Sequence, residues 1–381
     1  QGHSNVVRIN DVIETECKFG NGLTQIRYAE DNARYACTQA FFVPEKKSSS
    51  LLLDRDGAYW ITGGGGGLAL HFVESLVSAG ATKIVLSGRN SSMTSRAIDE
   101  LAIYRAKGIR VDYLSCDITK YEEVQNVIQW IETNIGPLKG VVHAAGVLRD
   151  SYILKKNNDE ISEVFAPKVT GLINLDQATK ALDLDFLLCC SSIASVFGNA
   201  GQADYAAANA FMASFLESRQ ALVKSGQRSG ASISIAWPLW KDGGMQVDQA
   251  SLITLHNHFG TVPMPTYDGI KAFEQILNSS VTTPITVYFG VTEKISNLLS
   301  QNDLGLTQLE EKPIVVGSPV NEHKLALNLL PLTVTFLKET LADLIQMDPV
   351  KIRSNRKLEE YGLDSIIIVE MTNKLEEFLG P

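Results

Sequence analysis

Short, continuous apolar runs alternate with longer amphipathic stretches between residues 56 and 295. The runs predict strands, and the amphipathic stretches predict helices. Because the runs are apolar throughout, we expect strands covered on both faces, in an α/β fold with a doubly wound parallel sheet. The expected strands are Tyr59–Thr62, Lys83–Leu86, Arg110–Leu114, Gly140–His143, Phe186–Cys190, Ser232–Trp237 and Ile285–Phe289. The expected helices are Leu68–Ser78, Ser95–Lys107, Tyr121–Asn134 and Asp204–Lys224, with further helical stretches before Leu182.

The segments on either side of this region have different patterns. The N-terminal one holds two strand-like pieces, Thr24–Tyr28 and Arg34–Phe41, followed by a polar linker. Such a small β element is too short to fold alone, so we expect it to pack on the α/β domain as the remnant of a structural subdomain. The expected division is an expression scar at 1–4, the β-rich remnant with its linker at 5–55, a catalytic domain at 56–295, a linker at 296–330 and a helical segment at 331–381.

The chain carries a net charge of −9, from 34 basic and 43 acidic residues. A nucleic-acid-binding protein usually has a basic surface that binds the phosphate backbone. The acidic net charge of this chain therefore argues against nucleic acid as a partner. No apolar stretch reaches the roughly 18 residues of a membrane span, so we expect no membrane partner. The five cysteines are odd in number and lie mostly in apolar runs, which favours reduced thiols and a cytoplasmic protein. The spacing of Cys and His predicts no metal site.

The first strand runs into five consecutive glycines that are followed by a helix. Glycine at such a turn lets the backbone approach a pyrophosphate, which then lies at the positive end of the helix. A glycine run alone could be a flexible loop, but its position between the first strand and the first helix favours a Rossmann-type dinucleotide site. The expected cofactor residues of this turn are Thr62, Gly63, Gly64, Gly65, Gly66, Gly67 and Leu68.

The second strand leads to Arg89, at a place where an NAD enzyme would carry a carboxylate for the ribose. A guanidinium suits a 2′-phosphate, so we expect NADPH, although a solvated surface charge would look the same in the sequence. Asp117, after the third strand, could accept a hydrogen bond from the adenine amine. The expected residues of this cofactor rim are Ser87, Arg89, Asp117, Ala144, Ala145 and Gly146.

Tyr205 and Asn209 lie four residues apart near the start of the long helix that follows the fifth strand. This spacing puts both side chains on one helical face, and the alanines between them leave room for a flat ring. Ser192 ends the run of the fifth strand. By itself a Tyr and Asn pair is more often packing or a surface hydrogen bond, so the surrounding motifs decide its meaning.

These motifs identify a family. Over residues 56–295 the chain resembles the ketoreductase domains of bacterial modular polyketide synthases, a branch of the short-chain dehydrogenase/reductase superfamily. The resemblance is carried by Thr62–Ala69, Leu86–Arg89, His143–Gly146, Phe165–Gly171, Ser191–Gly201, Gln202–Phe211 and Trp237–Trp240. The stretch Ser48–Asp56 is similar to that of trans-acyltransferase synthases.

The resemblance implies NADPH-dependent reduction of a carrier-tethered β-ketoacyl thioester to the β-hydroxyacyl thioester. It implies a catalytic tetrad of Lys168, Ser192, Tyr205 and Asn209, in which lysine and asparagine are exchanged relative to stand-alone enzymes. The chemistry fits, because a phenol with a pKa of ~10 is a weak acid unless a cation such as Lys168 stabilises its anion. Ser192 can donate to the carbonyl oxygen, and Asn209 can orient Lys168 or a water. Lys168 and Tyr205 are also expected to contact the cofactor.

Two further positions bear on stereochemistry through the resemblance. One class of these reductases carries Leu-Asp-Asp after the fourth strand, and the opposite class carries Trp eight residues before the catalytic Tyr. Here Leu148-Arg149-Asp150 keeps the final Asp, and Phe197 stands at the position of the Trp. The resemblance therefore implies a B-type enzyme that gives the D-hydroxyl, with the substrate arm entering past Asp150. Alternatively, Asp150 only caps the following helix.

The C-terminal segment contains a predicted amphipathic helix at Leu337–Met347 and a second helix that opens near Asp364-Ser365. Asp364-Ser365 could be a simple N-cap. The motif also resembles the phosphopantetheine attachment site of acyl carrier domains, which implies 4′-phosphopantetheine on Ser365. As partners it implies an acyl carrier domain bearing the β-ketoacyl chain and other domains of a multidomain synthase. Carriers are four-helix bundles, so we expect a partial, truncated carrier domain that packs on the reductase or on a neighbouring copy.

Two other functions remain open. A stand-alone short-chain dehydrogenase acting on a free ketone or alcohol is disfavoured by Asn209, by the N-terminal β element and by the carrier-like tail. A catalytically silent scaffold domain is disfavoured by the intact Lys168, Ser192 and Tyr205. Consumption of NADPH in the presence of a β-ketoacyl thioester on a short pantetheine mimic discriminates an enzyme from a scaffold.

Overall fold

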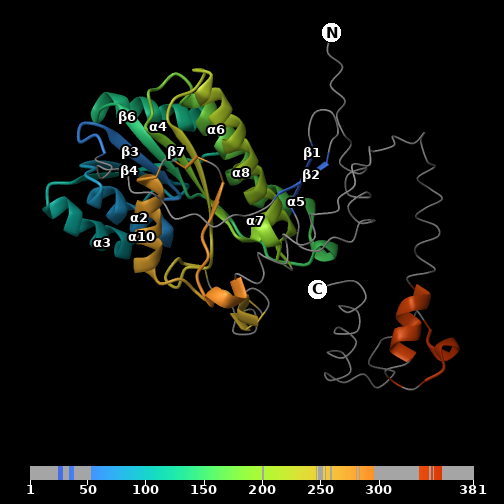
Figure 1. Ribbon diagram of the computed structural model, residues 1–381. Coiled ribbons are helices and arrows are strands. Elements are labelled where there is room, and N and C mark those ends of the chain that lie inside the picture. Colours follow the sequence, from blue (N-terminus) through green and yellow to red (C-terminus); the bar gives the residue numbers. More distant parts are fainter. Residues whose placement is uncertain are drawn as a thin grey trace, which may run out of the picture. The chain divides into compact units, whose positions relative to one another are not determined.

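The computed structural model describes residues 25–28, 34–37, 53–295 and 334–353. Positions 200, 246, 248–251, 254, 258–259, 280, 283, 343–344 and 346 within these ranges are not described. The chain divides into two compact units, one made of Leu23–Arg27 and Ala36–Leu309 and the other containing Glu310–Pro381. The larger unit holds the α/β domain, whose sheet and covering helices are seen in Figure 1.

The α/β domain is built on a seven-stranded sheet in which all neighbouring strands are parallel. The strands are β3 (Ala58–Thr62), β4 (Lys83–Gly88), β5 (Arg110–Ser115), β6 (Leu138–His143), β7 (Phe186–Ser192), β8 (Ala231–Trp237) and β9 (Ile285–Thr286). Their order is β5-β4-β3-β6-β7-β8-β9, so the strand order reverses between β3 and β6. This is the Rossmann arrangement, which leaves a crevice beyond the carboxyl ends of β3 and β6.

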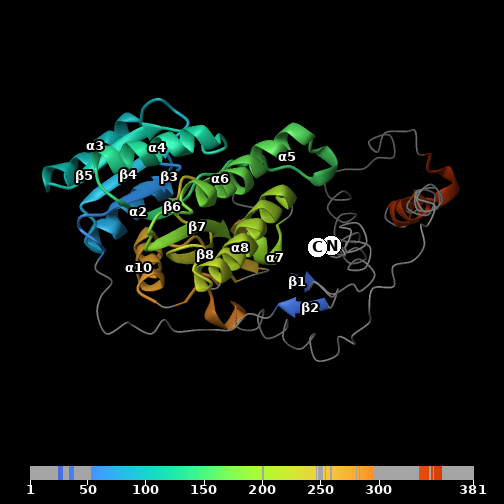
Figure 2. The same ribbon diagram turned by 90° about the horizontal axis from the view of Figure 1, so that it is seen from above.

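Helices cover both faces of the sheet (Figure 2). One face is covered by α2 (Gly67–Ser78), α3 (Ser95–Ala106) and α10 (Thr266–Leu277), and the other by α4 (Tyr121–Asn134), α6 (Gly171–Ala178) and α8 (Ala203–Lys224). Strand β3 shows why both layers form. Tyr59 and Ile61 point into the apolar cluster under α2, whereas Trp60 points into the cluster under α4. A strand that is apolar at every position must be buried on both sides.

The structure confirms the predicted doubly wound parallel sheet and differs from the expected elements at two places. It adds α10 and the short α7 (Ala194–Phe197) to the expected helices. It also shortens the last strand to Ile285–Thr286, after which Val287 makes a last backbone hydrogen bond to Ala236 of β8. Beyond them the carbonyl of Phe289 accepts the N–H of Val262, so the chain leaves the sheet for a neighbouring loop.

The flanking segments are described in part. Strands β1 (Gln25–Tyr28) and β2 (Arg34–Cys37) pair in a two-stranded sheet, in agreement with the two strand-like pieces of the sequence. The expected packing of residues 5–44 on the α/β domain lies outside the described residues. In the C-terminal unit, residues 334–342 form a helix whose Leu341 and Ala342 pack with Ile352. The expected second helix lies outside the description.

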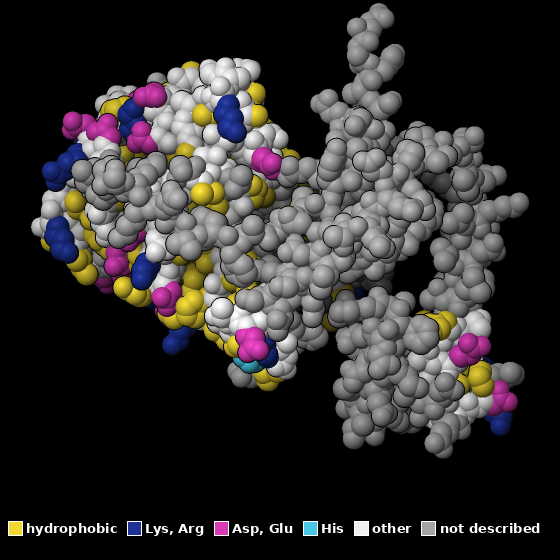
Figure 3. Space-filling view, viewed as in Figure 1, with side chains coloured by type: hydrophobic (Ala, Val, Ile, Leu, Met, Phe, Trp, Pro, Cys, Tyr) yellow, Lys and Arg dark blue, Asp and Glu magenta, His cyan; other side chains and the backbone are white. Residues whose placement is uncertain are grey.

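The described surface of the α/β domain mixes charges of both signs. On the face shown in Figure 3, Lys and Arg side chains are interspersed with Asp and Glu side chains. Among the helices that the structure describes, none combines the length and the apolar character needed to cross a membrane.

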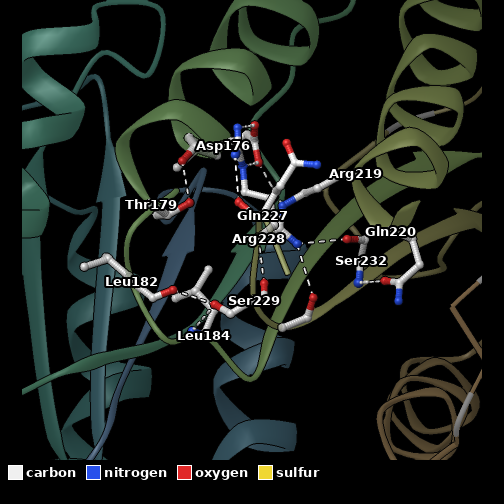
Figure 4. A network of polar contacts seen from close by, with 12 residues as sticks. Asp176, Thr179, Leu182, Leu184, Arg219, Gln220, Gln227, Arg228, Ser229 and Ser232 are labelled. Carbon is white, nitrogen blue, oxygen red and sulfur yellow. Dashed lines mark hydrogen bonds and ion pairs between the residues drawn. The ribbon is translucent and has the colours of Figure 1, made fainter. Parts of the chain in front are cut away.

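A buried ion-pair network ties α6, α8 and the loop before β8 together (Figure 4). Asp176 Oδ1 accepts from Nε of Arg219 at 2.9 Å and from Nε of Arg228 at 3.0 Å. Arg219 also donates to the hydroxyl of Ser232 and to the carbonyl of Ser229. Arg219 is 1% exposed and Asp176 is 3% exposed, so each charge depends on its partners for compensation. The network fixes the distal half of α8 against α6.

Asp176→Asn should destabilise the α/β domain by roughly 3–5 kcal/mol, because the buried Arg219 guanidinium loses its counter-charge. Urea unfolding followed by tryptophan fluorescence measures the loss. Glu100→Gln breaks the exposed Arg96–Glu100 pair and serves as the control, whose midpoint should stay nearly unchanged. An unchanged midpoint for Asp176→Asn would show that the network does not stabilise the fold.

Candidate active site

The glycine-rich turn between β3 and α2 is shaped by two close backbone approaches. Gly63 has a φ of +76°, and a Cβ on it would lie 2.9 Å from the backbone of Ala144. A Cβ on Gly67 would lie 2.9 Å from the carbonyl carbon of Gly243. Helix α2 begins at Gly67 without a side-chain cap, so backbone N–H groups of its first turn are suited to bind a phosphate.

A cleft of about 230 Å³ opens where β3, β4 and β6 end. This is the point at which the strand order reverses, where dinucleotides bind in this fold. Seven of the expected cofactor residues line it: Thr62, Gly63, Ser87, Arg89, Asp117, Ala145 and Gly146. Gly64 to Leu68 continue the same turn into α2, and Ala144 contacts Gly63. With Glu163, Ala166 and Pro167, the cleft gathers residues from five separate parts of the sequence.

Arg89 and Asp117 follow the neighbouring strands β4 and β5. The Arg89 side chain is exposed and lines the cleft, so its guanidinium is accessible to an anionic group. The Asp117 carboxylate accepts the N–H of Thr119 at 3.1 Å and its hydroxyl at 2.7 Å. These bonds fix the carboxylate in the turn that precedes α4.

Lys168 lies on a π-helical turn, η2 (Ala166–Thr170), between α5 (Asn158–Phe165) and α6. Such turns insert an extra residue into a helix and are common at functional sites. The turn directs Lys168 into the domain, where it is 4% exposed. Its ammonium is within 3.5 Å of the Cys190 carbonyl on β7. The irregular turn thus brings a charged side chain to the edge of the sheet.

His143, the last residue of β6, supports this turn. Its Nε2 donates to the carbonyl of Pro167 at 3.0 Å, and its Nδ1 accepts from the hydroxyl of Thr62 at 2.8 Å. Burial, together with the nearby Lys168 ammonium, lowers the pKa of His143 to about 3. The imidazole is therefore neutral at pH 7, as this pair of hydrogen bonds requires.

Lys168, Asn209 and Tyr205 form one buried group. Lys168 Nζ donates to Asn209 Oδ1 at 3.0 Å and lies 5.2 Å from the centroid of the Tyr205 ring. Asn209 Nδ2 in turn donates to the Tyr205 carbonyl at 2.8 Å. Burial lowers the pKa of the Lys168 ammonium to about 8. The Asn209 amide therefore links the ammonium to the helix that carries Tyr205.

Tyr205 is 9% exposed, and this burial raises the pKa of its phenol. Hydrogen bonding with Ser192 and Asn209 opposes the rise, whereas the Asp150 carboxylate adds to it. The phenol consequently keeps its proton at neutral pH, which is the form able to donate to a carbonyl oxygen. All four residues expected in the catalytic tetrad come together at this end of the sheet.

Asp150 and Phe197 lie in different surroundings. Asp150 is exposed, and its carboxylate accepts a hydrogen bond from Gln202 Nε2 at 2.8 Å, just before α8. Phe197 is 7% exposed and packs on Tyr288, with ring centroids 5.9 Å apart. That apolar cluster is separate from the one that contains Tyr205. The structure thus places Asp150 beside Gln202, just before the helix of Tyr205, and buries the Phe197 ring against Tyr288.

The cleft also has a lining that the sequence motifs do not single out. Val147, Thr119 and Glu163 face it, and Glu163 Oε2 pairs with Arg149 Nε at 2.8 Å. The only sequence signal for Glu163 is its place on the helix that leads to Lys168. His143 belongs to a motif of the family resemblance, but its bridging role could not be predicted, because it depends on contacts with two other segments.

Two expectations concern other sites. Ser365, the expected attachment site, lies outside the described residues. Within residues 53–295 and the other described ranges, no group of three His, Cys, Asp or Glu side chains is arranged to hold a metal ion.

Two family models match the chain. The KR domain model matches residues 57–242, a range that contains the cleft and the four candidate catalytic residues. The model of the phosphopantetheine attachment site matches residues 335–381, a range that contains Ser365.

Curated relatives are large synthases. The chain is 35% identical over 335 residues to polyketide synthase PksL of Bacillus subtilis (strain 168), and 36% identical over 327 residues to polyketide synthase PksN of the same organism. The matches cover 85% and 84% of this chain. They cover only 7% and 6% of the two relatives, so the chain spans a small part of their length.

A solved structure completes the comparison. The crystal structure of a ketoreductase domain from the bacillaene assembly line superposes with a TM-score of 0.64 at 35% identity. The match covers 76% of this chain and 68% of that one. The chain therefore belongs to the ketoreductase domains of bacterial polyketide synthases, which are oxidoreductases, and its ketoreductase domain is followed by a phosphopantetheine carrier domain.

Proposed function

We propose that the α/β domain uses NADPH to reduce a carrier-tethered β-ketoacyl thioester to the β-hydroxyacyl thioester. The observation that carries this proposal is the buried Lys168 ammonium, bonded to Asn209 and held 5.2 Å from the Tyr205 ring. A buried cation is costly, so its position beside a phenol and close to a cleft favours a catalytic role over a structural one.

Reduction places a hydride on the β-carbon and a proton on its oxygen. The hydride is the contribution of the nicotinamide when the cofactor is bound. Tyr205 donates its hydroxyl proton to the carbonyl oxygen, and Lys168 stabilises the phenolate that is left. Ser192 donates a hydrogen bond to the same oxygen while negative charge develops on it. Asn209 holds the Lys168 ammonium in place.

The residues of the cleft fit a dinucleotide that carries a 2′-phosphate. The close approach of Gly63 to Ala144 forms a cradle that a Cβ would fill, and the first turn of α2 is placed to bind the pyrophosphate. Arg89 would hold the 2′-phosphate. Asp117, fixed by Thr119, would accept from the adenine amine. These features favour NADPH over NADH.

We infer that the reduction is B-type. Asp150 lies beside the segment that leads to Tyr205, and position 197 carries Phe in place of the Trp of the opposite class. The substrate arm therefore enters past Asp150, which yields the D-hydroxyl. Chiral chromatography of the alcohol from an unbranched β-ketoacyl substrate should show mainly the D-product, and a predominance of the L-alcohol would contradict this assignment.

We infer that the substrate is delivered by an acyl carrier domain of a multidomain synthase. The match of residues 335–381 to a phosphopantetheine attachment site supports this, with Ser365 as the residue that carries 4′-phosphopantetheine. We also propose that the ketoreductase domain spans residues 56–295 and that a linker at 296–330 joins it to the carrier segment at 331–381.

Tyr205→Phe should abolish reduction and leave the Kd for NADPH nearly unchanged, because only the proton-donating hydroxyl is lost. The rate is measured by NADPH absorbance with a β-ketoacyl pantetheine thioester, and the Kd by fluorescence titration. Tyr267→Phe is the control, since Tyr267 lies on α10 and is 73% exposed. Turnover of Tyr205→Phe close to that of the unchanged protein would remove Tyr205 from its role.

The rate of reduction should fall as the pH rises through about 8, where Lys168 loses its proton. The rate falls with rising pH because Lys168 is fully protonated well below this pKa. Above the pKa the neutral amine no longer stabilises the phenolate. A pH profile of kcat/KM measures the fall. Lys168→Ala should lower the rate and remove this inflection, whereas Asn209→Ala should retain it and lose less activity. A worse defect in Asn209→Ala would reverse the assigned roles.

Arg89→Ala should raise the KM for NADPH roughly tenfold to a hundredfold, because a charge-assisted hydrogen bond to the 2′-phosphate is lost. The KM for NADH should change little, since NADH lacks that phosphate. Steady-state kinetics with both cofactors give the two ratios. Arg96→Ala, at an exposed arginine of α3, is the control for a general loss of positive charge. Equal increases for NADPH and NADH would contradict the role of Arg89.

A further inference from the structure

A buried ion pair joins the edge of the active site to the helix that carries Tyr205. Lys156 Nζ lies 2.8 Å from Asp204 Oδ2, and the two side chains are 1% and 4% exposed. Asp204 immediately precedes Tyr205, and its Oδ1 accepts the backbone N–H of Tyr205 at 2.9 Å. One carboxylate thus binds both the Lys156 ammonium and the backbone of the residue that we place in proton transfer.

Lys156 also closes the segment in which it lies. Its ammonium donates to the carbonyl of Arg149. This hydrogen bond joins the first and last residues of the segment 149–156, here called the mouth loop. The mouth loop follows Val147, which lines the cleft. It contains Asp150, the residue past which the substrate arm is proposed to enter. The position of the mouth loop therefore affects the route to Tyr205.

Two weaker contacts run beside the ion pair. The N–H of Ser151 donates to the carbonyl of Gly201 at 2.9 Å, and Gln202 Nε2 donates to Asp150 at 2.8 Å. The Asp150 contact is solvent-exposed, and exposed polar contacts contribute little to stability. Loss of one partner of the buried pair costs more free energy, because it would leave a charge uncompensated away from water.

A buried ion pair often contributes no more to the free energy of unfolding than an apolar pair of similar volume, so stability alone does not explain it. What it provides is a defined geometry, because the charges tolerate only arrangements that keep them together. We propose that the Lys156–Asp204 pair is a positioning device that holds the mouth loop against the first turn of α8, and that it sets the side from which the acyl arm reaches Tyr205. The proposal rests on the reductase function proposed above.

The test compares Lys156→Met and Asp204→Asn with the unchanged protein on an unbranched β-ketoacyl pantetheine thioester. In both variants the ratio of D- to L-alcohol should fall by about tenfold, which corresponds to about 1.4 kcal/mol between the two transition states. The KM for the thioester should rise, while the Kd for NADPH stays unchanged. Asp176→Asn is the matched control, since its ion pair with Arg219 has side chains that are likewise 1% and 4% exposed. It should lose stability but keep the product ratio.

A second measurement does not depend on turnover. Hydrogen exchange of the mouth-loop amides, that of Ser151 included, should accelerate in Lys156→Met and remain unchanged in Asp176→Asn. If Lys156→Met does not fold, Lys156→Met/Asp204→Asn serves in its place, because it leaves no uncompensated charge and keeps an oxygen for the Tyr205 N–H. This double variant should show the same fall in product ratio and the same faster exchange.

An unchanged product ratio together with unchanged exchange would overturn the proposal. A product ratio that falls equally in Asp176→Asn would also overturn it, because the effect would then come from general destabilisation. If the unchanged protein reduces no β-ketoacyl thioester, the proposed function fails. Faster exchange confined to the mouth loop in Lys156→Met would still support the positioning of that loop by the ion pair.

Discussion

The burial of one ammonium group, that of Lys168, is the constraint on which the rest of the site depends. A cation taken out of water must be compensated by acceptors at defined positions. Asn209 Oδ1 on α8 and the Cys190 carbonyl on β7 supply them, at 3.0 and 3.5 Å. Burial still lowers the pKa of Lys168 to about 8, so its charge is sensitive to small changes in its surroundings. The elements that carry these acceptors must therefore hold their relative positions closely.

The parallel sheet meets this requirement because all its strands end at the same edge. Thr62 and His143 end the neighbouring strands β3 and β6, and His143 binds both Thr62 and the π-helical turn of Lys168. With a pKa of about 3, His143 stays neutral and adds no second cation beside Lys168. The reversal of strand order also opens the cleft at this edge, so the residues that we propose for the cofactor and those that we propose for catalysis lie close together.

Helix α8 carries Tyr205 and Asn209, and buried ion pairs hold it at two points. Arg219 binds Asp176 in the distal half of the helix, whereas Asp204 binds Lys156 in its first turn. The two pairs are equally buried, but only the second connects the helix to the mouth loop. In our proposal, the same kind of interaction stabilises the fold at one end of a helix and defines the approach to the reacting groups at the other.

Local sequence patterns were enough to predict the succession of strands and helices along the chain, the glycine turn, and the placement of Tyr205 and Asn209 on one helical face. The resemblance to a family added Lys168, which no local pattern singles out. Four features became visible in the folded molecule alone: the π-helical turn, the two hydrogen bonds of the neutral His143 side chain, the cleft lining by Glu163, and the Lys156–Asp204 pair, whose partners are 48 residues apart. Such contacts arise because folding brings distant polar groups together and removes the water around them. Neither effect can be predicted from the spacing of neighbouring residues.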